Sequence, residues 1–229
     1  MKDDETSVVK RIPSGVLTLG DNDNLFPPGF FLFEPFNMII SGVTNSGKTH
    51  FVLDLLENVY SNYFDNIVLF CPTFFHNETY NRQWIFKDKK FIVLDPNLVK
   101  TQLNDVIKYC IEIFKSSNTL FIIDDCANLH DVKRKATELC HLAFSGRHYG
   151  ISTWVLIQKY NSLVKDFREN IRFLVLFYNK DENAMKQALE ENAVIPKEKR
   201  ENVLVFLKEN KTGKLLIRLQ FPRSFLLIK

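Results

Sequence analysis

The stretch GVTNSGKTH, residues 42 to 50, holds residue types at the spacing that binds a phosphate chain. Gly42 and Gly47 allow the backbone to curl so that successive N–H groups face one anion, and the start of a following helix adds partial positive charge. On this template Lys48 reaches the outer phosphates and Thr49 offers its hydroxyl to Mg²⁺. The alternative is an ordinary glycine turn. The motif predicts a nucleoside triphosphate site made of Gly42, Val43, Thr44, Asn45, Ser46, Gly47, Lys48, Thr49 and His50.

A pair of acids, Asp124 and Asp125, ends the apolar run TLFII. Open α/β sheets place their ligands at the carboxyl ends of their strands, where this pair is expected to lie. Asp124 then joins Thr49 in the metal site as a partner of the magnesium ion just beyond its direct ligands, the Walker B role, and Asp125 orients or deprotonates a water. The alternative is an acid pair that opens the next turn. Adjacent carboxylates repel each other and need a cation or solvent nearby, which favours the metal-site interpretation.

The segment AFSGRHYGISTWVLIQKYN contains two further catalytic candidates, Arg147 and Gln158. If its strand neighbours the phosphate-loop strand, Gln158 reaches the γ-phosphate or the attacking water. Otherwise Gln158 is a solvated edge residue. Arg147 follows a glycine that ends a helix, so we expect its side chain at the ligand edge of the sheet, as an arginine finger for a neighbouring subunit. Arg168 and Arg172 are the alternates, and capping of the helix end is the other use of Arg147.

Nearly continuous apolar runs alternate with helical patterns along the chain, as in a parallel sheet covered on both faces. Strands are predicted at residues 36–41, 66–71, 91–95, 119–124, 152–158 and 172–179, and helices after the phosphate loop and at 98–115, 131–144 and about 181–191. The fold class is a three-layer α/β sheet with right-handed crossovers. A β-hairpin is predicted at about 203–221, turning at 211–213. Residues 1–25 are expected to form an arm and 26–229 one domain.

Length and composition limit the other classes of function. The chain has 229 residues and a net charge of only +3, so a nucleic-acid surface must be local. Its four cysteines lack metal-ligand spacing, which is typical of reduced packing residues in an intracellular protein. No run approaches the roughly 20 apolar residues that span a bilayer, and the polar start lacks a signal-peptide core.

Two basic segments, NRQWIFKDKK (residues 81–90) and VKRK (residues 132–135), are candidate contacts for double-stranded DNA. The VKRK segment fits the solvated face of a helix equally well. The candidates are Arg82, Lys87, Lys89, Lys90, Lys133, Arg134 and Lys135.

Taken together, GVTNSGKT, TLFIIDD and SGRHYGISTWVLIQ resemble the poxvirus-type genome-packaging ATPases of the FtsK-HerA superfamily of P-loop NTPases, found also in virophages and Polinton-like elements. The similarity covers about residues 35 to 180. It implies an ATP- and Mg²⁺-dependent motor that threads double-stranded DNA into a preformed capsid. It also implies an extra strand between the phosphate-loop strand and the Walker B strand. Asp125 departs from the wider superfamily, whose cellular members usually carry glutamate there, so the shorter acid lies farther from the water.

The resemblance further implies a homo-oligomeric ring, a pentamer or hexamer, and a capsid vertex or portal-like partner. It implies a place in the host-cell cytoplasm or viral factory, or association with the virion. Two other classes of function stay open. One is a different DNA translocase or helicase of the same superfamily. The other is a P-loop kinase or nucleotide switch, although a kinase needs an arginine-bearing lid and residues 76–90 hold a single arginine.

Overall fold

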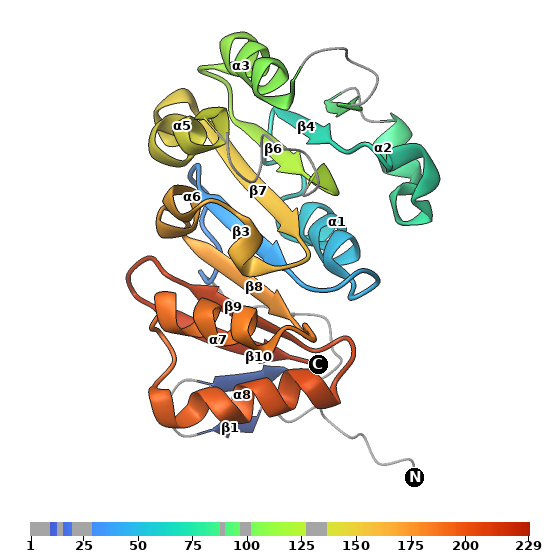
Figure 1. Ribbon diagram of the computed structural model, residues 1–229. Helices are drawn as coiled ribbons and strands as arrows, with labels where there is room; N and C mark the ends of the chain where they lie inside the picture. The colour runs from blue at the N-terminus through green and yellow to red at the C-terminus, as the bar shows by residue number, and fades with distance from the viewer. Residues whose placement is uncertain (1–9, 13–15, 20–28, 88–89, 97–101, 127–136) are drawn as a thin grey trace.

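The computed structural model describes residues 10–12, 16–19, 29–87, 90–96, 102–126 and 137–229. Its centre is a ten-stranded sheet in the order β1-β2-β10-β9-β8-β3-β7-β6-β4-β5 (Figure 1). Six neighbouring strands run parallel, and those at the β1 end include antiparallel pairs. Because the six parallel strands share a direction, their carboxyl ends lie along one edge of the sheet.

The parallel strands are short and almost wholly apolar, since both of their faces are covered. Every residue of the four central strands is buried. All six predicted strands are confirmed, with ends within one or two residues of those expected. They are β3 (Asn37–Ser41), β4 (Asn66–Phe70), β5 (Phe91–Leu94), β6 (Thr119–Ile123), β7 (Ile151–Ile157) and β8 (Phe173–Phe177).

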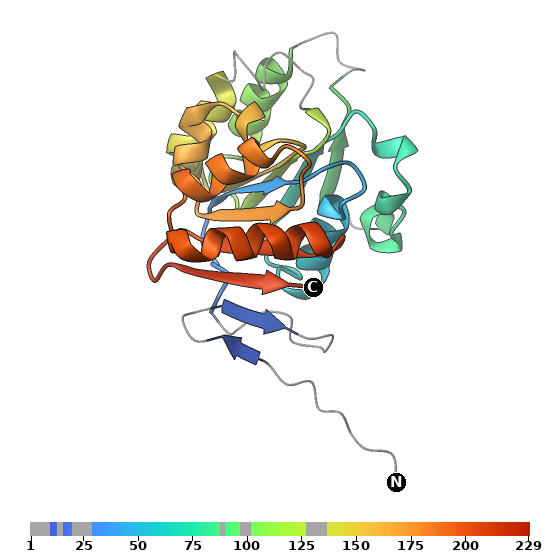
Figure 2. The same cartoon turned by 60° about the horizontal axis from the view of Figure 1, so that its bottom comes forward.

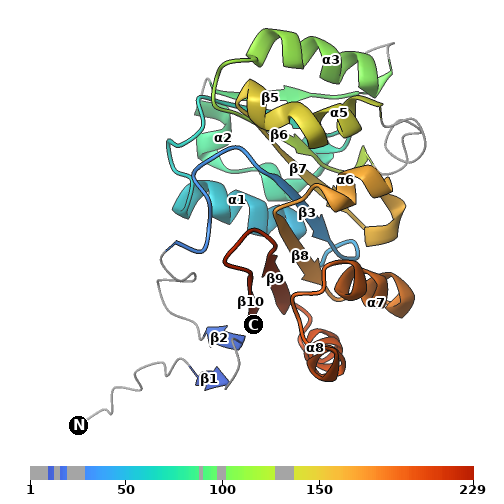
Figure 3. The same cartoon turned by 90° about the vertical axis from the view of Figure 1, so that its left-hand side faces the viewer.

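Helices cover the sheet on both faces, so the three-layer arrangement is confirmed (Figure 3). On one face lie α1 (Lys48–Asn58) and the segment with η1 (Phe74–His76), η2 (Glu78–Tyr80) and α2 (Gln83–Lys87). The helices of the other face pack on a second core cluster. They are α3 (Leu103–Phe114), α5 (Thr137–Ser145), α6 (Lys165–Glu169), α7 (Glu182–Glu191) and α8 (Lys197–Glu209), with the short η4 (Gly146–Tyr149) and η5 (Tyr160–Ser162) between some of them.

The C-terminal hairpin exists, but its predicted position at 203–221 is wrong. It consists of β9 (Lys214–Arg218) and β10 (Ser224–Ile228), and β9 pairs with β8. Residues 203–209, predicted as the first strand of the hairpin, belong instead to helix α8. The alternation of apolar residues after position 203 resembles a strand, yet Val203 and Leu207 also lie four residues apart and bury one helical face.

Two short strands lie inside the segment that we expected to be an arm. They are β1 (Lys10–Ile12) and β2 (Val16–Leu19), which pair with each other, and β2 continues the sheet from β10 (Figure 2). The division into an arm of residues 1–25 and a domain of 26–229 stays a prediction. Among the described residues, no helix combines the length and apolar character needed to cross a membrane.

Candidate nucleotide site

The phosphate loop connects β3 to α1 and is shaped by its backbone. Asn45 has φ 62° and Gly47 has φ 95°, both in the left-handed region. A Cβ at Gly42 would lie 2.6 Å from Phe177 Cβ and 2.7 Å from Ser46 Oγ, so a side chain there would have to displace its neighbours. No described side chain caps the start of α1. The N–H groups of that helix end can therefore hold an anion.

Lys48 lies across this loop. Its Nζ donates hydrogen bonds of 2.8 Å to the carbonyl oxygens of Gly42 and Val43. Burial lowers the pKa of Lys48, and the negative charges of Asp124 and Asp125 oppose that shift. The loop thus holds a cation beside its own N–H groups, as binding of the outer phosphates requires.

Asp124 and Thr49 meet at the carboxyl end of β6. Thr49 Oγ1 donates to Asp124 Oδ2 at 3.0 Å, and Tyr80 Oη donates to the same oxygen at 2.5 Å. The Asp124 side chain is buried, which raises the pKa of its carboxyl group; the Asp125 charge adds to the rise, and both hydrogen bonds oppose it. A hydroxyl and a carboxylate at this distance are oxygen ligands of the kind that Mg²⁺ prefers.

Asp125 occupies a different environment from its neighbour. It is exposed, accepts a 2.7 Å hydrogen bond from Thr73 Oγ1, and has φ 54°. A non-glycine residue in the left-handed region costs of order 1–3 kcal/mol and persists only where surrounding contacts hold it. The turn separates the two acids, with Asp124 inside and Asp125 facing solvent.

Gln158 is brought next to the phosphate loop. It follows β7, which lies between β3 and β6, and Gly42 N donates a 3.1 Å hydrogen bond to the carbonyl of Ile157. Asn179 Nδ2 donates to the backbone carbonyl of Gln158 at 2.5 Å, which fixes the strand end. The extra strand implied by the resemblance is therefore present. The side chain of Gln158 is exposed at the ligand edge.

His50, the last residue assigned to the loop, points elsewhere. Its Nδ1 lies 3.2 Å from Arg82 Nη2, and its Nε2 lies 3.4 Å from a carboxylate oxygen of Asp54. The ring thus belongs to a polar cluster on the outer side of α1. Only its backbone N–H remains as a candidate for the phosphates.

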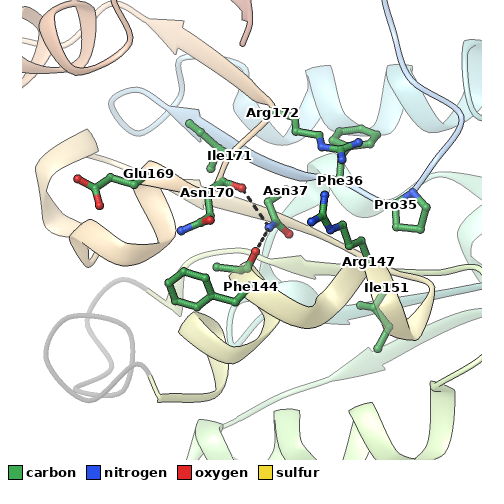
Figure 4. A pocket seen from close by; sticks show the side chains of 11 residues that line it. Pro35, Phe36, Asn37, Phe144, Arg147, Ile151, Glu169, Asn170, Ile171 and Arg172 are labelled. Atoms are coloured by element: carbon green, nitrogen blue, oxygen red, sulfur yellow. Dashed lines mark hydrogen bonds between the residues drawn. The ribbon is translucent and has the colours of Figure 1, made fainter. Parts of the chain in front are cut away.

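The expectation that Arg147 lies at the ligand edge of its own sheet is wrong. Arg147 belongs to η4, which precedes β7, and a residue before a parallel strand lies at the amino edge. There it lines a pocket of about 220 Å³ with Asn37 and Arg172 (Figure 4). The seven residues of β7 separate this edge from Gln158. At about 3.3 Å per residue, the separation is roughly 20 Å, so Arg147 cannot reach the phosphate loop of its own subunit.

The two alternate candidates for the arginine finger both take part in ion pairs. Arg168 is buried, donates to both carboxylate oxygens of Glu191 at 2.5 and 2.6 Å, and lies 5.1 Å from the Tyr160 ring centroid. Arg172 donates to Glu34 at 2.5 Å beside the same pocket as Arg147. Arg168 therefore has a structural role, whereas Arg147 is exposed.

The basic residues proposed to contact DNA differ in their surroundings. Arg82 forms ion pairs with Asp54 at 2.9 Å and Glu57 at 2.7 Å. Its positive charge is therefore balanced within the protein. Lys87 and Lys90 are exposed. The other candidates, Lys89, Lys133, Arg134 and Lys135, lie outside the described residues.

Tyr80 and Thr73 were not predicted from the sequence as residues of the site. Both precede the acids that they contact by more than 40 residues, with β5 and α3 between. No local spacing links them to Asp124 or Asp125. The one available signal was the position of Thr73 just after a strand that was predicted to be parallel.

The fold and the site define a class of protein. A phosphate loop after β3, an acid pair after β6 and an intervening β7 make this a P-loop NTPase with an additional central strand. The model of the family described as "Poxvirus A32 protein" matches residues 27–219. The chain belongs to this family, which confirms the resemblance to the poxvirus-type packaging proteins.

Individual relatives agree with the family. The DNA packaging protein OPG160 of monkeypox virus is 30% identical over 151 residues, which cover 62% of this chain and 48% of the relative. Its variola virus counterpart is 30% identical over 167 residues, covering 67% of this chain and 59% of the relative. The chain thus spans about half the length of the curated relatives it matches.

Solved structures share the fold at low sequence identity. B204, the DNA-packaging ATPase from Sulfolobus turreted icosahedral virus, has a TM-score of 0.65 and 15% identity, over 86% of this chain and 98% of that one. The genome packaging NTPase B204 from Sulfolobus turreted icosahedral virus 2, in complex with ATP-gammaS, has a TM-score of 0.59 and 14% identity, over 85% and 97% of the chains.

Proposed function

We propose that this chain is an ATPase that moves double-stranded DNA into a preformed viral capsid. The observation that carries the proposal is the meeting of Lys48, Thr49 and Asp124 at the end of the phosphate loop. Membership of a family whose matched relatives are named DNA packaging proteins supports the choice of DNA as the substrate. A kinase is disfavoured because Arg82, the arginine of the segment considered as a lid, is bound to Asp54 and Glu57.

The residues present fit a magnesium ion. Thr49 and Asp124 would hold it, and the ion would supply positive charge to the outer phosphates. Lys48 offsets the negative charge that builds on the same phosphates in the transition state. Asp125, facing solvent with its carboxylate held by Thr73, orients the attacking water, and Gln158 lies at the same edge to contact the γ-phosphate.

In the assembly we propose, subunits form a pentameric or hexameric ring at a capsid vertex or portal-like component. The ring works in the host-cell cytoplasm or viral factory. In this proposal Arg147 of one subunit acts on the phosphates bound by the next. Because it lies roughly 20 Å from its own loop, any contact that it makes with a bound nucleotide has to cross a subunit boundary. Another translocase of the FtsK-HerA type would share the same site and differ in the component on which it docks.

The experiment that tests the function is ATP hydrolysis measured with and without duplex DNA. We expect DNA to stimulate hydrolysis and no phosphate to be transferred to nucleosides or nucleotides. Transfer to such an acceptor without stimulation by DNA would overturn the proposal in favour of a kinase.

DNA affinity should fall steeply with salt and depend little on sequence, because a motor must travel over any base pair. Each phosphate contact contributes a slope of about −0.9 in the logarithm of the binding constant against the logarithm of salt concentration. Lys87→Gln should reduce the magnitude of that slope by about one. Lys165→Gln is the matched control, because Lys165 pairs with Glu169 on α6. A flat salt dependence in the unmodified protein would count against this surface.

Asp125→Asn should spare nucleotide binding and slow hydrolysis by about a hundredfold, because the amide cannot accept a proton from water. The asparagine oxygen can still accept the hydrogen bond from Thr73, so the turn is preserved. Asp124→Ala should instead weaken Mg²⁺-dependent nucleotide binding. Binding by fluorescence and steady-state hydrolysis distinguish the two effects. A parental rate in Asp125→Asn would remove Asp125 from the catalytic residues.

A further inference from the structure

The segment of residues 71–87, between β4 and β5, is fastened to both parts of the nucleotide site. Arg82 binds Asp54 and Glu57 on α1, and Trp84 Nε1 also donates a hydrogen bond to Glu57. At the other end, Thr73 holds Asp125. The segment therefore links the helix that follows the phosphate loop to the acids that follow β6.

Tyr80 lies in the middle of this segment, with only 3% of the residue exposed. Its ring centroid lies 5.1 Å from that of Phe74, and its hydroxyl reaches Asp124 Oδ2 at 2.5 Å. Packing alone does not require that hydroxyl, since phenylalanine fills nearly the same volume. A buried hydroxyl next to a buried carboxylate instead gives a charge-assisted hydrogen bond, roughly twice as strong as a neutral one.

The same oxygen of Asp124 also accepts from Thr49 at 3.0 Å. Two donors from different elements fix the rotation of the carboxylate. With its hydrogen directed at Asp124, the Thr49 hydroxyl keeps its lone pairs for a cation. Without Tyr80, the Asp124 carboxylate can turn, and the Thr49 hydroxyl loses a fixed partner.

We propose that Tyr80 is a positioning residue that holds Asp124 and, through it, Thr49 in the arrangement that receives the magnesium ion of the bound nucleotide. This inference rests on the proposed ATPase function and deepens it. Because the buried Tyr80 hydroxyl acts through Asp124, its effect should appear only when the metal is present.

The test compares the affinity of Tyr80→Phe for a fluorescent N-methylanthraniloyl ATP in Mg²⁺ and in EDTA. Loss of one hydrogen bond to a charged group is expected to weaken binding in Mg²⁺ about tenfold and leave binding in EDTA unchanged. In an Asp124→Ala background, which removes the acceptor of this hydrogen bond, Tyr80→Phe should have no further effect. Equal weakening in both conditions would mean a packing role and overturn the inference, and so would unchanged binding in both.

Tyr60→Phe is the matched control. Tyr60 is also buried, and its hydroxyl donates to the carbonyl of Leu32 at 3.1 Å, away from the acids. This variant should leave the Mg²⁺ effect intact. An unmodified protein that binds no nucleotide in either condition would overturn the ATPase proposal together with this one. Metal-dependent binding that Tyr80→Phe leaves unchanged would overturn the role of Tyr80 alone.

Discussion

Replacing Lys48 by alanine is expected to reduce DNA-stimulated ATP hydrolysis by roughly a hundredfold to a thousandfold, the loss typical of removing one fixed group that stabilises transition-state charge. Lys48 is the cation of the phosphate loop, and its ammonium group lies 2.8 Å from two loop carbonyls. The fold should tolerate the change, because burial already disfavours the charged form of this side chain. Phosphate release in the steady state measures the effect, with thermal unfolding as a check on the structure.

Lys165→Ala serves as the control for this experiment. Lys165 pairs with Glu169 on the exposed side of α6. Its removal should leave hydrolysis within about twofold, since exposed ion pairs contribute little. A Lys48→Ala protein that hydrolyses ATP within tenfold of the parental rate would remove the ammonium group from the mechanism.

Arg147→Ala should lower hydrolysis by about a thousandfold or more, as expected for an arginine finger. Because Arg147 is separated from its own phosphate loop by the length of β7, an arginine finger at this position has to act on the site of a neighbouring subunit. Mixing Arg147→Ala with Lys48→Ala should then restore part of the activity. In evenly mixed rings, about a quarter of the head-to-tail interfaces join an intact Lys48 to an intact Arg147.

A double variant gives the matched control for mixing. Lys48→Ala/Arg147→Ala combined with Arg147→Ala contains no intact Arg147, so hydrolysis should not rise above the level of the unmixed Arg147→Ala protein. If the first mixture also shows no recovery while native mass spectrometry detects mixed rings, Arg147 does not act across the boundary. Its role would then be confined to the pocket at the amino edge.

The residues whose positions in the fold were predicted correctly are those whose signal lies in one short stretch. The phosphate loop and the acid pair each follow an apolar strand directly, and parallel strands bring such endings to one edge. Arg147 was misplaced for the same geometric reason. It precedes its strand, so the rule that places Gln158 at the ligand edge places Arg147 at the opposite one.

Contacts between distant segments gave no such signal. Tyr80 meets Asp124 only because β4 pairs with β6 although β5 follows β4 in the chain. The charge of Arg82 suggested a solvent-facing contact, yet two carboxylates on α1 bind it. These ion pairs could not be predicted from the number of basic residues, since Asp54 and Glu57 simply belong to the polar side of an amphipathic helix pattern.

The separation of Lys48 and Arg147 at opposite edges also restricts the symmetry of any assembly that uses both. A two-fold dimer joins like surfaces, so it cannot give each phosphate loop the arginine edge of the other subunit unless one patch contains both edges. The contact is instead heterologous, and an open chain of subunits always leaves one loop without its arginine. Only closure completes every site. Unclosed assemblies would therefore carry one idle site each, and closing the circle would itself raise the activity per subunit.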